Sequence, residues 1–244
     1  MWLLDAKTYR LKFFHEATGY AILSHTWGNE EVSFQQIQDL EAARRLRGFE
    51  KIRLTCTQAL EDGLSYAWVD TCCIDKKSSA ELSEAINSMF RYYTRSTACY
   101  VYLSDVTTTR AENFDVAPDW LAKSRWFTRG WTLQELIAPS KVLFFSTHWR
   151  QIGSKHDLAI CLAEITGIHL PVLRSSGVLG KYSGAQRMSW AAHRETTRPE
   201  DRAYSLLGLF DINMPLLYGE GEKAFARLQQ EIIKSSEDHS IFLW

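Results

Sequence analysis

Polar side chains that can take part in catalysis follow two apolar stretches of the sequence. The first stretch ends in Ser24, His25 and Trp27, and the second ends in Asp70. A histidine exchanges protons near neutral pH, a carboxylate can stabilise a developing cation, and an indole ring offers a face for stacking. The same residues also have ordinary structural roles: His25 as a hydrogen-bonded strand end, Trp27 as a plug at the sheet edge, and Asp70 as a loop cap.

A Trp-rich segment, Ser124–Leu136, carries the most distinctive local pattern. If it is helical, Trp131 and Glu135 lie four residues apart on one face, and Arg125 and Arg129 are stacked in the same way. The apolar face of this helix would leave Glu135 beside Trp131 at its margin rather than in open water. Arg129 then either contacts a phosphate or pairs with a neighbouring acid.

The cysteines do not indicate a metal site. All five lack the repeated C-x-x-C pairs or the histidine spacing that zinc ligands require. Cys72 or Cys73 would act as a nucleophile only with a histidine within reach, and His25 is the one candidate near the same sheet edge. Their neighbours are typical of a buried strand, which favours core cysteines.

The elements that must position these residues alternate between strands and helices. This alternation predicts an α/β fold, a doubly wound and mainly parallel sheet with helices on both faces, followed by a helical C-terminal extension. We expect one domain over residues 1–244, with an α/β core at 1–150 and a helical part at 151–244 packed on it. The strands are predicted at 20–27, 66–74, 98–103 and 141–145, and the helices at 51–61, 79–93, 118–137, 157–166, 183–195, 199–210 and 220–236.

Composition and short motifs exclude several classes of function. A net charge of -1 predicts no attraction to nucleic acid or to anionic lipid. No apolar run approaches the length of a membrane span, and the unpaired cysteine set predicts a reducing, cytoplasmic location. No G-x-G-x-x-G or Walker motif occurs, so neither a redox cofactor nor a P-loop ligand is expected. The apolar end Ile241–Trp244 predicts a strand or a contact with a longer chain.

Five segments, in order and spacing, resemble the blocks of HET (heterokaryon incompatibility) domains, and together they cover nearly the whole chain. They are Ala21-Ile-Leu-Ser-His-Thr-Trp-Gly28, Trp68-Val-Asp-Thr-Cys-Cys-Ile-Asp75, Trp126-Phe-Thr-Arg-Gly-Trp-Thr-Leu-Gln-Glu-Leu136, Thr197-Arg-Pro-Glu-Asp-Arg-Ala-Tyr-Ser-Leu-Leu-Gly208 and Leu217-Tyr-Gly-Glu-Gly-Glu222. The resemblance implies a cell-death effector in fungal non-self recognition. It also implies self-association on clustering, and fusion to or recruitment by a nucleotide-binding receptor.

HET domains are regarded as distant relatives of TIR domains, which implies a TIR/flavodoxin-like sheet and cleavage of NAD⁺ as a substrate, with no bound cofactor. Glu135 is the residue that matches the catalytic glutamate of TIR enzymes, although this chain lacks their cysteine and inserts extra residues. The resemblance thus implies an NAD⁺ nucleosidase with Glu135 as the key carboxylate. Asp70 and His25 would orient the substrate or the attacking water, and the binding residues would be Ser24, Trp27, Trp131 and Arg129.

The competing class is a non-enzymatic adaptor that signals by self-association. An enzyme needs Glu135, Asp70 and the 24–27 loop around one cavity, whereas an adaptor can leave Glu135 in a surface ion pair. Asp201, Arg202 and Tyr204 either line such a site or stabilise the helical part.

Overall fold

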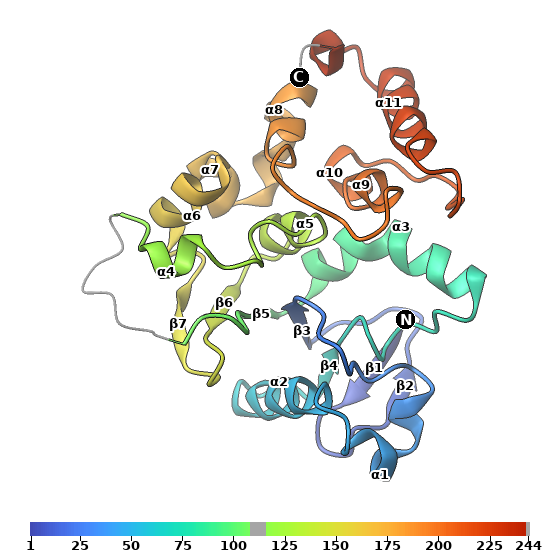
Figure 1. Cartoon of the computed structure of the whole chain (residues 1–244), viewed down its shortest axis with the longest axis vertical. Coiled ribbons are helices and arrows are strands. Elements are labelled where there is room, and N and C mark those ends of the chain that lie inside the picture. Colours follow the sequence, from blue (N-terminus) through green and yellow to red (C-terminus); the bar gives the residue numbers. More distant parts are fainter. Residues whose placement is uncertain (108–115, 243–244) are drawn as a thin grey trace.

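The computed structural model describes residues 1–107 and 116–242, and a seven-stranded sheet runs through its centre (Figure 1). The strand order is β2-β1-β4-β3-β5-β6-β7. The strands are β1 (Trp2–Asp5), β2 (Leu11–Phe13), β3 (Tyr20–His25), β4 (Tyr66–Trp68), β5 (Ala98–Tyr102), β6 (Val142–Phe145) and β7 (Gln151–Ser154). The four central strands are parallel, and both edges are antiparallel.

The helices occupy both faces of the sheet, as the sequence predicts. Helix α2 packs against β3 and β4 on one face, and α5 packs against β3 on the other with α3 next to it (Figure 1). The helices are α1 (Leu40–Ala43), α2 (Phe49–Glu61), α3 (Ser79–Arg95), α4 (Asp119–Ala122), α5 (Thr132–Ile137), α6 (Ala159–Thr166), α7 (Leu170–Arg174), α8 (Gly184–Ser189), α9 (Asp201–Tyr204), α10 (Leu207–Phe210) and α11 (Lys223–Ser235), with 3₁₀ turns η1 (Gln36–Gln38), η2 (Ser176–Lys181) and η3 (His239–Phe242).

The clearest predicted helix, α3, has the expected start and face. Ser78 caps it by accepting a hydrogen bond from the backbone N–H of Glu81. The buried face includes Ile86, Met89 and Tyr93, which recur at helical spacing. Because α3 packs on α5 and α10 while its Tyr93 hydroxyl donates to the carbonyl of Leu23 in β3, α3 connects the sheet to the C-terminal helices.

The prediction of a mainly parallel sheet was incomplete, because it named four strands and missed three antiparallel ones. Strands β1, β2 and β7 have only three or four residues each, too few for a period-two pattern to be recognised. In β2 two of the three residues are exposed, and β7 contains Gly153. They add the antiparallel edges to the predicted parallel centre.

The predicted strand over 66–74 is too long. β4 ends at Trp68, and the chain then turns because the N–H groups of Cys72 and Cys73 both donate to the carbonyl of Val69, at 3.2 and 2.8 Å. Apolar residues fill this turn because it is buried, which made it resemble a strand. The turn directs Asp70 away from the sheet and toward the carboxyl edge of β3.

The predicted helix over 118–137 is interrupted, and only its two ends are helical. In between, the Thr132 hydroxyl donates to the carbonyl groups of Trp126 and Arg129, at 2.6 and 2.8 Å, in competition with helical hydrogen bonds. The Gly130 N–H donates at 2.8 Å to the carbonyl of Glu195, a residue far along the chain. A Cβ at Gly130 would lie 2.5 Å from Thr196 Cγ2, so glycine permits this close approach.

The predicted helical part at 151–244 begins with a strand of the sheet, β7, and the helices that follow are shorter and more numerous than predicted. Helix α10 packs on α3, and α7 packs on α5 and α6, so that these helices cover the α3–α5 side (Figure 1). The buried residues form a continuous hydrophobic core. A strand was one prediction for the apolar end, but Ile241 and Phe242 lie in the 3₁₀ turn η3. Residues 243–244 of that end lie outside the described residues. None of the helices in the described residues is long and apolar enough to cross a membrane.

Candidate active site at the carboxyl edge of the sheet

The order of the parallel strands creates a crevice at the end of β3. From β3 the chain passes through α2 to β4 on one side, and then through α3 to β5 on the other side of β3. The carboxyl ends of β3 and β5 therefore flank the point where the strand order reverses, which is where open α/β sheets bind ligands. Ser24 and His25 end β3 at this point, opposite Val101 and Tyr102 of β5.

Glu135 of α5 is buried directly above the end of β3. The Ser24 hydroxyl donates a short hydrogen bond to Glu135 Oε2. Ser24 Oγ in turn accepts from the indole Nε1–H of Trp126, at 2.9 Å. An indole can only donate, so the hydroxyl proton of Ser24 is left for Glu135. This chain of hydrogen bonds fixes the position and orientation of the Glu135 carboxyl.

The environment of Glu135 changes its acidity. Burial raises the pKa of Glu135 to about 8, and the negative charge of Asp70 adds to this effect. The hydrogen bond from Ser24 and the positive charge of Arg129 act in the opposite direction. A carboxyl with this pKa exchanges its proton close to neutral pH, as acids and bases of active sites commonly do.

A second polar cluster surrounds His25. Its Nδ1 lies 3.8 Å from Asp70 Oδ1, and its Nε2 lies 3.7 Å from Glu31 Oε2. His25 Nε2 and Asp70 Oδ1 are buried and have no hydrogen-bond partner in the described part of the chain. Although burial alone would raise it, contacts with His25 and Lys51 lower the pKa of Glu31 to about 2. The imidazole therefore lies between two acidic side chains.

Trp27 connects the second cluster to the surface. Its indole N–H donates to Asp70 Oδ2 at 2.8 Å, and 43% of the residue is exposed. The ammonium of Lys76 lies 3.8 Å from the centre of the Trp27 ring, and the guanidinium of Arg129 lies 5.7 Å from it. Both distances are within the range of cation–π attraction. The ring thus holds two cations at the carboxyl edge.

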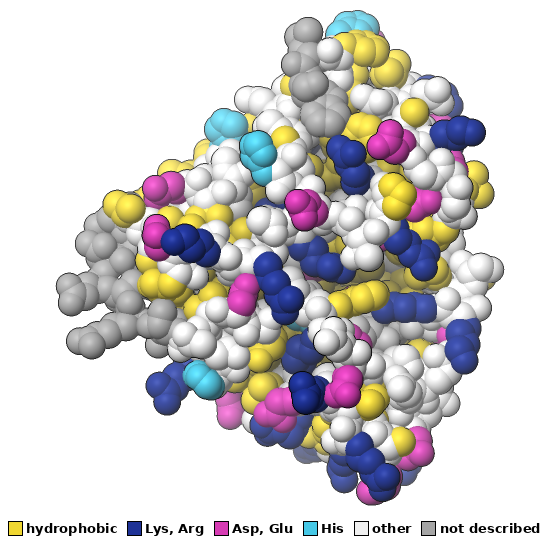
Figure 2. Space-filling model, viewed as in Figure 1, with side chains coloured by type: hydrophobic (Ala, Val, Ile, Leu, Met, Phe, Trp, Pro, Cys, Tyr) yellow, Lys and Arg dark blue, Asp and Glu magenta, His cyan; other side chains and the backbone are white. Residues whose placement is uncertain are grey.

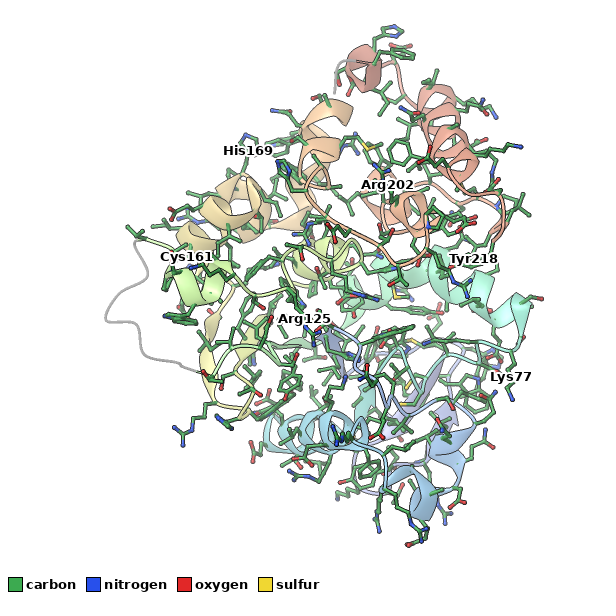
Figure 3. All side chains as sticks on the ribbon, in the orientation of Figure 1. Lys77, Arg125, Cys161, His169, Arg202 and Tyr218 are labelled. Atoms are coloured by element: carbon green, nitrogen blue, oxygen red, sulfur yellow. The ribbon has the colours of Figure 1, made fainter. Side chains whose placement is uncertain are left out.

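A polar pocket of about 320 Å³ opens next to Trp27, and we call it the cationic pocket. Glu135 does not belong to its lining, but Arg129 borders the pocket and also acts on the pKa of Glu135. Figure 2 shows Lys and Arg side chains across the middle of the viewed face, and Figure 3, in the same orientation, places Arg125 between α2 and α5. The lining residues are Thr26, Trp27, Arg125, Thr128, Arg129, Glu195, Thr196 and Thr197.

Comparisons with known proteins match this chain to one family. Residues 20–120 match the family model described as Heterokaryon incompatibility protein (HET). Over 221 residues the chain is 52% identical to Vegetative incompatibility protein HET-E-1 of Podospora anserina. The chain belongs to the HET family. That alignment covers 88% of this chain and 16% of the relative, and no solved structure matches the chain.

Several predicted site residues of this HET domain lie together. Ser24 and Glu135 are hydrogen-bonded, and Trp27 and Arg129 border the cationic pocket. Asp70 and His25 lie next to each other, but no direct contact joins His25 to Glu135 in residues 1–107 and 116–242.

Trp131 points elsewhere. It hydrogen-bonds the carboxyl of Asp201. Burial raises the pKa of Asp201, and the hydrogen bonds from Tyr218 and Trp131 partly oppose this effect. Tyr204 has a structural environment: its hydroxyl donates to Glu220 and accepts from the Leu217 N–H, at 3.1 and 2.8 Å. Arg202 lies with its guanidinium 5.8 Å from the Phe225 ring, on α9 (Figure 3).

The cysteines of the HET domain are placed as core residues. Cys72 is fully buried, and burial raises the pKa of its thiol well above the usual range, so it would not form a thiolate near neutral pH. Cys73 is buried beside it and accepts a hydrogen bond from the Val69 N–H. In the described ranges, no group of three or more His, Cys, Asp or Glu side chains is arranged to hold a metal ion.

Several residues around Glu135 and His25 were not predicted from the sequence. Trp126 was quoted only as part of a motif, yet it supplies the donor to Ser24. Glu31, Lys51 and Lys76 lie in segments that have no distinctive pattern, and their roles follow from which side chains they meet in the fold. Only Trp126 carried a usable signal, since a buried indole needs an acceptor.

Proposed function

We propose that this HET domain is a cell-death effector in fungal heterokaryon incompatibility and that it acts by hydrolysing NAD⁺. The observation that carries the proposal is the Glu135 carboxyl: it is buried at the strand-order reversal, oriented by Ser24, and next to a pocket lined by cations. A buried acid with a pKa of about 8 is unfavourable for folding, so its presence at this position favours a functional role.

The arrangement of the central strands supports the TIR-like part of the proposal. Along the chain, β3, β4, β5 and β6 are the first to fourth parallel strands, and their order in the sheet is second, first, third, fourth. Flavodoxin-like sheets have this order and bind their ligand between the first and third strands. Glu135 lies at the corresponding place, which is consistent with its match to the TIR glutamate.

One carboxylate is sufficient for the reaction. Nicotinamide leaves as a neutral ring: the bond from C1′ to the ring nitrogen breaks, and its electron pair goes to that nitrogen, so no acid is needed. Water adds its oxygen to C1′ and gives up a proton, which the carboxylate or solvent accepts. Glu135 would hydrogen-bond the ribose hydroxyls and stabilise the positive charge that develops on the sugar.

Substrate binding would bring Glu135 into the ionised form that this role needs. The nicotinamide ring of NAD⁺ is cationic, and an opposite charge within a few ångströms favours the carboxylate. The unpaired, buried atoms His25 Nε2 and Asp70 Oδ1 are available to orient the substrate or the attacking water. We propose a single domain over residues 1–244, since the lining of the cationic pocket includes residues from segments 26–27 and 125–129 of the core and from segment 195–197 of the C-terminal part.

The test is nicotinamide release from NAD⁺ by the purified chain, at high concentration and after forced clustering. We expect release by the native chain and its loss in Glu135→Ala and Glu135→Gln, because both remove the carboxylate. Glu237→Gln, a change at an exposed carboxyl, is the matched control and should retain activity. Circular dichroism and thermal unfolding check that every variant is folded. A clustered native chain that leaves NAD⁺ intact would contradict the proposal.

One observation favours a second function, a non-enzymatic adaptor that signals by self-association. Glu135 is only 8% exposed and does not line the cationic pocket. In the enzyme proposal, a fused or recruited nucleotide-binding receptor clusters the domain in the cytoplasm. Clustering then joins the cationic pocket to the Glu135 carboxyl. In the adaptor proposal the site only stabilises loops. Cell death that persists in Glu135→Gln would favour the adaptor.

A further inference from the structure

The cationic pocket has the composition of an anion site. Its charged lining consists of two arginines, Arg125 and Arg129, and one acid, Glu195. The ammonium of Lys76 does not line the pocket but lies over the ring of Trp27, which does. The pocket therefore carries an excess of positive charge on a chain whose total charge is -1.

The two arginines retain donors for a ligand. Arg125 uses one guanidinium nitrogen to donate to Ser104 Oγ at 3.1 Å, and Arg129 contacts the Trp27 ring. In the described ranges no ion pair joins either guanidinium to a carboxylate, and Arg125 is exposed while Arg129 is half-buried. A guanidinium presents paired donors that match phosphate oxygens in a bidentate way.

Trp27 explains how the cations are held in place. Its indole N–H is bound to Asp70 Oδ2, so the ring has a fixed orientation. Lys76 and Arg129 lie over this ring, and cation–π attraction keeps both near the pocket. The ring face under Lys76 is thus occupied, which makes Trp27 a platform for cations rather than a free surface for a base.

Four threonines complete the lining of the cationic pocket. Thr26 and Thr197 lie around the pocket with Thr128 and Thr196, and the volume of about 320 Å³ exceeds what one phosphate requires. Ligand pockets for small molecules begin at roughly 300 Å³. A diphosphate has two adjacent charged groups, which matches two arginines better than a single phosphate does.

We infer that the cationic pocket binds the diphosphate of a nucleotide, with Arg125 and Arg129 as the contact residues. This inference rests on the proposed function, since the nucleotide would be NAD⁺ with its nicotinamide ribose directed toward Glu135. It adds a requirement on the substrate: a nicotinamide nucleoside without a diphosphate would be a poor substrate. Arg125 and Arg129 are then specificity-determining residues.

The test measures binding separately from turnover. Isothermal titration calorimetry is carried out on the Glu135→Gln chain, which cannot turn over substrate in this scheme, with ADP-ribose, ADP, pyrophosphate and adenosine. We expect the three diphosphates to bind and adenosine to bind at least about tenfold more weakly. Arg125→Met and Arg129→Met should each weaken ADP-ribose binding about tenfold, as expected for the loss of one charge-assisted contact.

Two controls address charge and folding. Arg174→Met removes an exposed arginine at the end of α7 and should leave ADP-ribose binding unchanged. Glu195→Gln removes the one acid of the lining and should strengthen binding a few-fold. Thermal unfolding of each variant shows whether it is folded, and having two arginine positions keeps the test decisive if one variant unfolds.

The possible outcomes separate this inference from the proposed function. If diphosphates bind through the arginines but the native chain releases no nicotinamide, the inferred diphosphate site is confirmed and the proposed NAD⁺ hydrolysis is wrong. If nicotinamide is released from nicotinamide riboside as fast as from NAD⁺, and the arginine variants behave as the native chain does, the hydrolase stands and the pocket is wrong. Equal binding of adenosine and ADP-ribose also overturns the inference.

Discussion

Replacing Glu135 by glutamine should stabilise the protein, and by an amount that depends on pH. Glutamine has the shape of glutamate and can still accept the hydrogen bond from Ser24, but it carries no charge. The pKa of Glu135 is about 8 in the folded protein against an ordinary value of 4.5 for glutamate. Each tenfold difference in proton affinity between the folded and unfolded states corresponds to about 1.4 kcal/mol.

The direction in which Glu135 changes the stability with pH follows from whether the folded or the unfolded state ionises first. Below a pH of about 4.5 both states carry the proton, and Glu135 does not oppose folding. As the pH rises, the unfolded chain ionises while the folded one remains protonated, so stability is lost until the folded carboxyl ionises above about 8. The loss amounts to about 1 kcal/mol at pH 5, about 3 at pH 7 and about 5 at pH 9.

The assay compares urea and thermal unfolding of the native chain and Glu135→Gln at pH 5, 7 and 9. Only the difference in stability between the native chain and the variant is interpreted, because other titrating groups contribute equally to both proteins. One such group is Lys155, whose pKa is lowered by burial to about 8. From pH 5 to 7 the variant should gain about 2 kcal/mol over the native chain, or about 4 to 8 °C in Tm. Stability curves that stay parallel across this range would refute the burial of an ionisable carboxyl at this position.

Three further predictions concern the same site. Trp126→Phe removes the donor to Ser24. It should lower the free energy of unfolding in urea by about 1–2 kcal/mol, and it should slow nicotinamide release roughly tenfold. Unchanged release would show that catalysis does not require Trp126 to orient Ser24. Gly130→Ala places a Cβ 2.5 Å from Thr196 Cγ2, and should cost about 1–3 kcal/mol in thermal unfolding; a neutral effect would contradict the close approach of the two segments. The kcat/KM for NAD⁺ should rise with pH up to about 8, where free Glu135 ionises, and a flat profile between pH 6 and 8 would exclude the carboxylate as the active form.

The sequence predicted the parallel centre of the fold because that part has a strong local signal. The strand at Tyr20–His25 is an unbroken apolar run, and the helix at Ser79–Arg95 has a cap and a regular apolar face. The antiparallel edges were not predictable in this way. Their strands are short, and they are stabilised by pairing rather than by a pattern of their own: β1 pairs with β4, β2 with β1, and β7 with β6.

The sequence named residues of the candidate site, but it did not contain their geometry. Ser24 and Glu135 were both named, but a continuous helix would have placed Glu135 at a margin beside Trp131. The hydroxyl of Thr132 and the pairing of Gly130 with a segment 65 residues away break that helix and bury the carboxyl instead. Contacts of this kind depend on the tertiary fold, which a local pattern does not contain.

The proposed hydrolysis of NAD⁺ by Glu135 is tested best by monitoring nicotinamide release from NAD⁺ at pH 8 with proton NMR. The clustered proteins compared are the native chain, Glu135→Gln and Glu237→Gln. We expect nicotinamide and ADP-ribose in equal amounts from the native chain and from Glu237→Gln, and roughly a hundredfold less of both from Glu135→Gln. Release by Glu135→Gln at the native rate, or no release by any of the three folded proteins, would contradict the proposed hydrolysis.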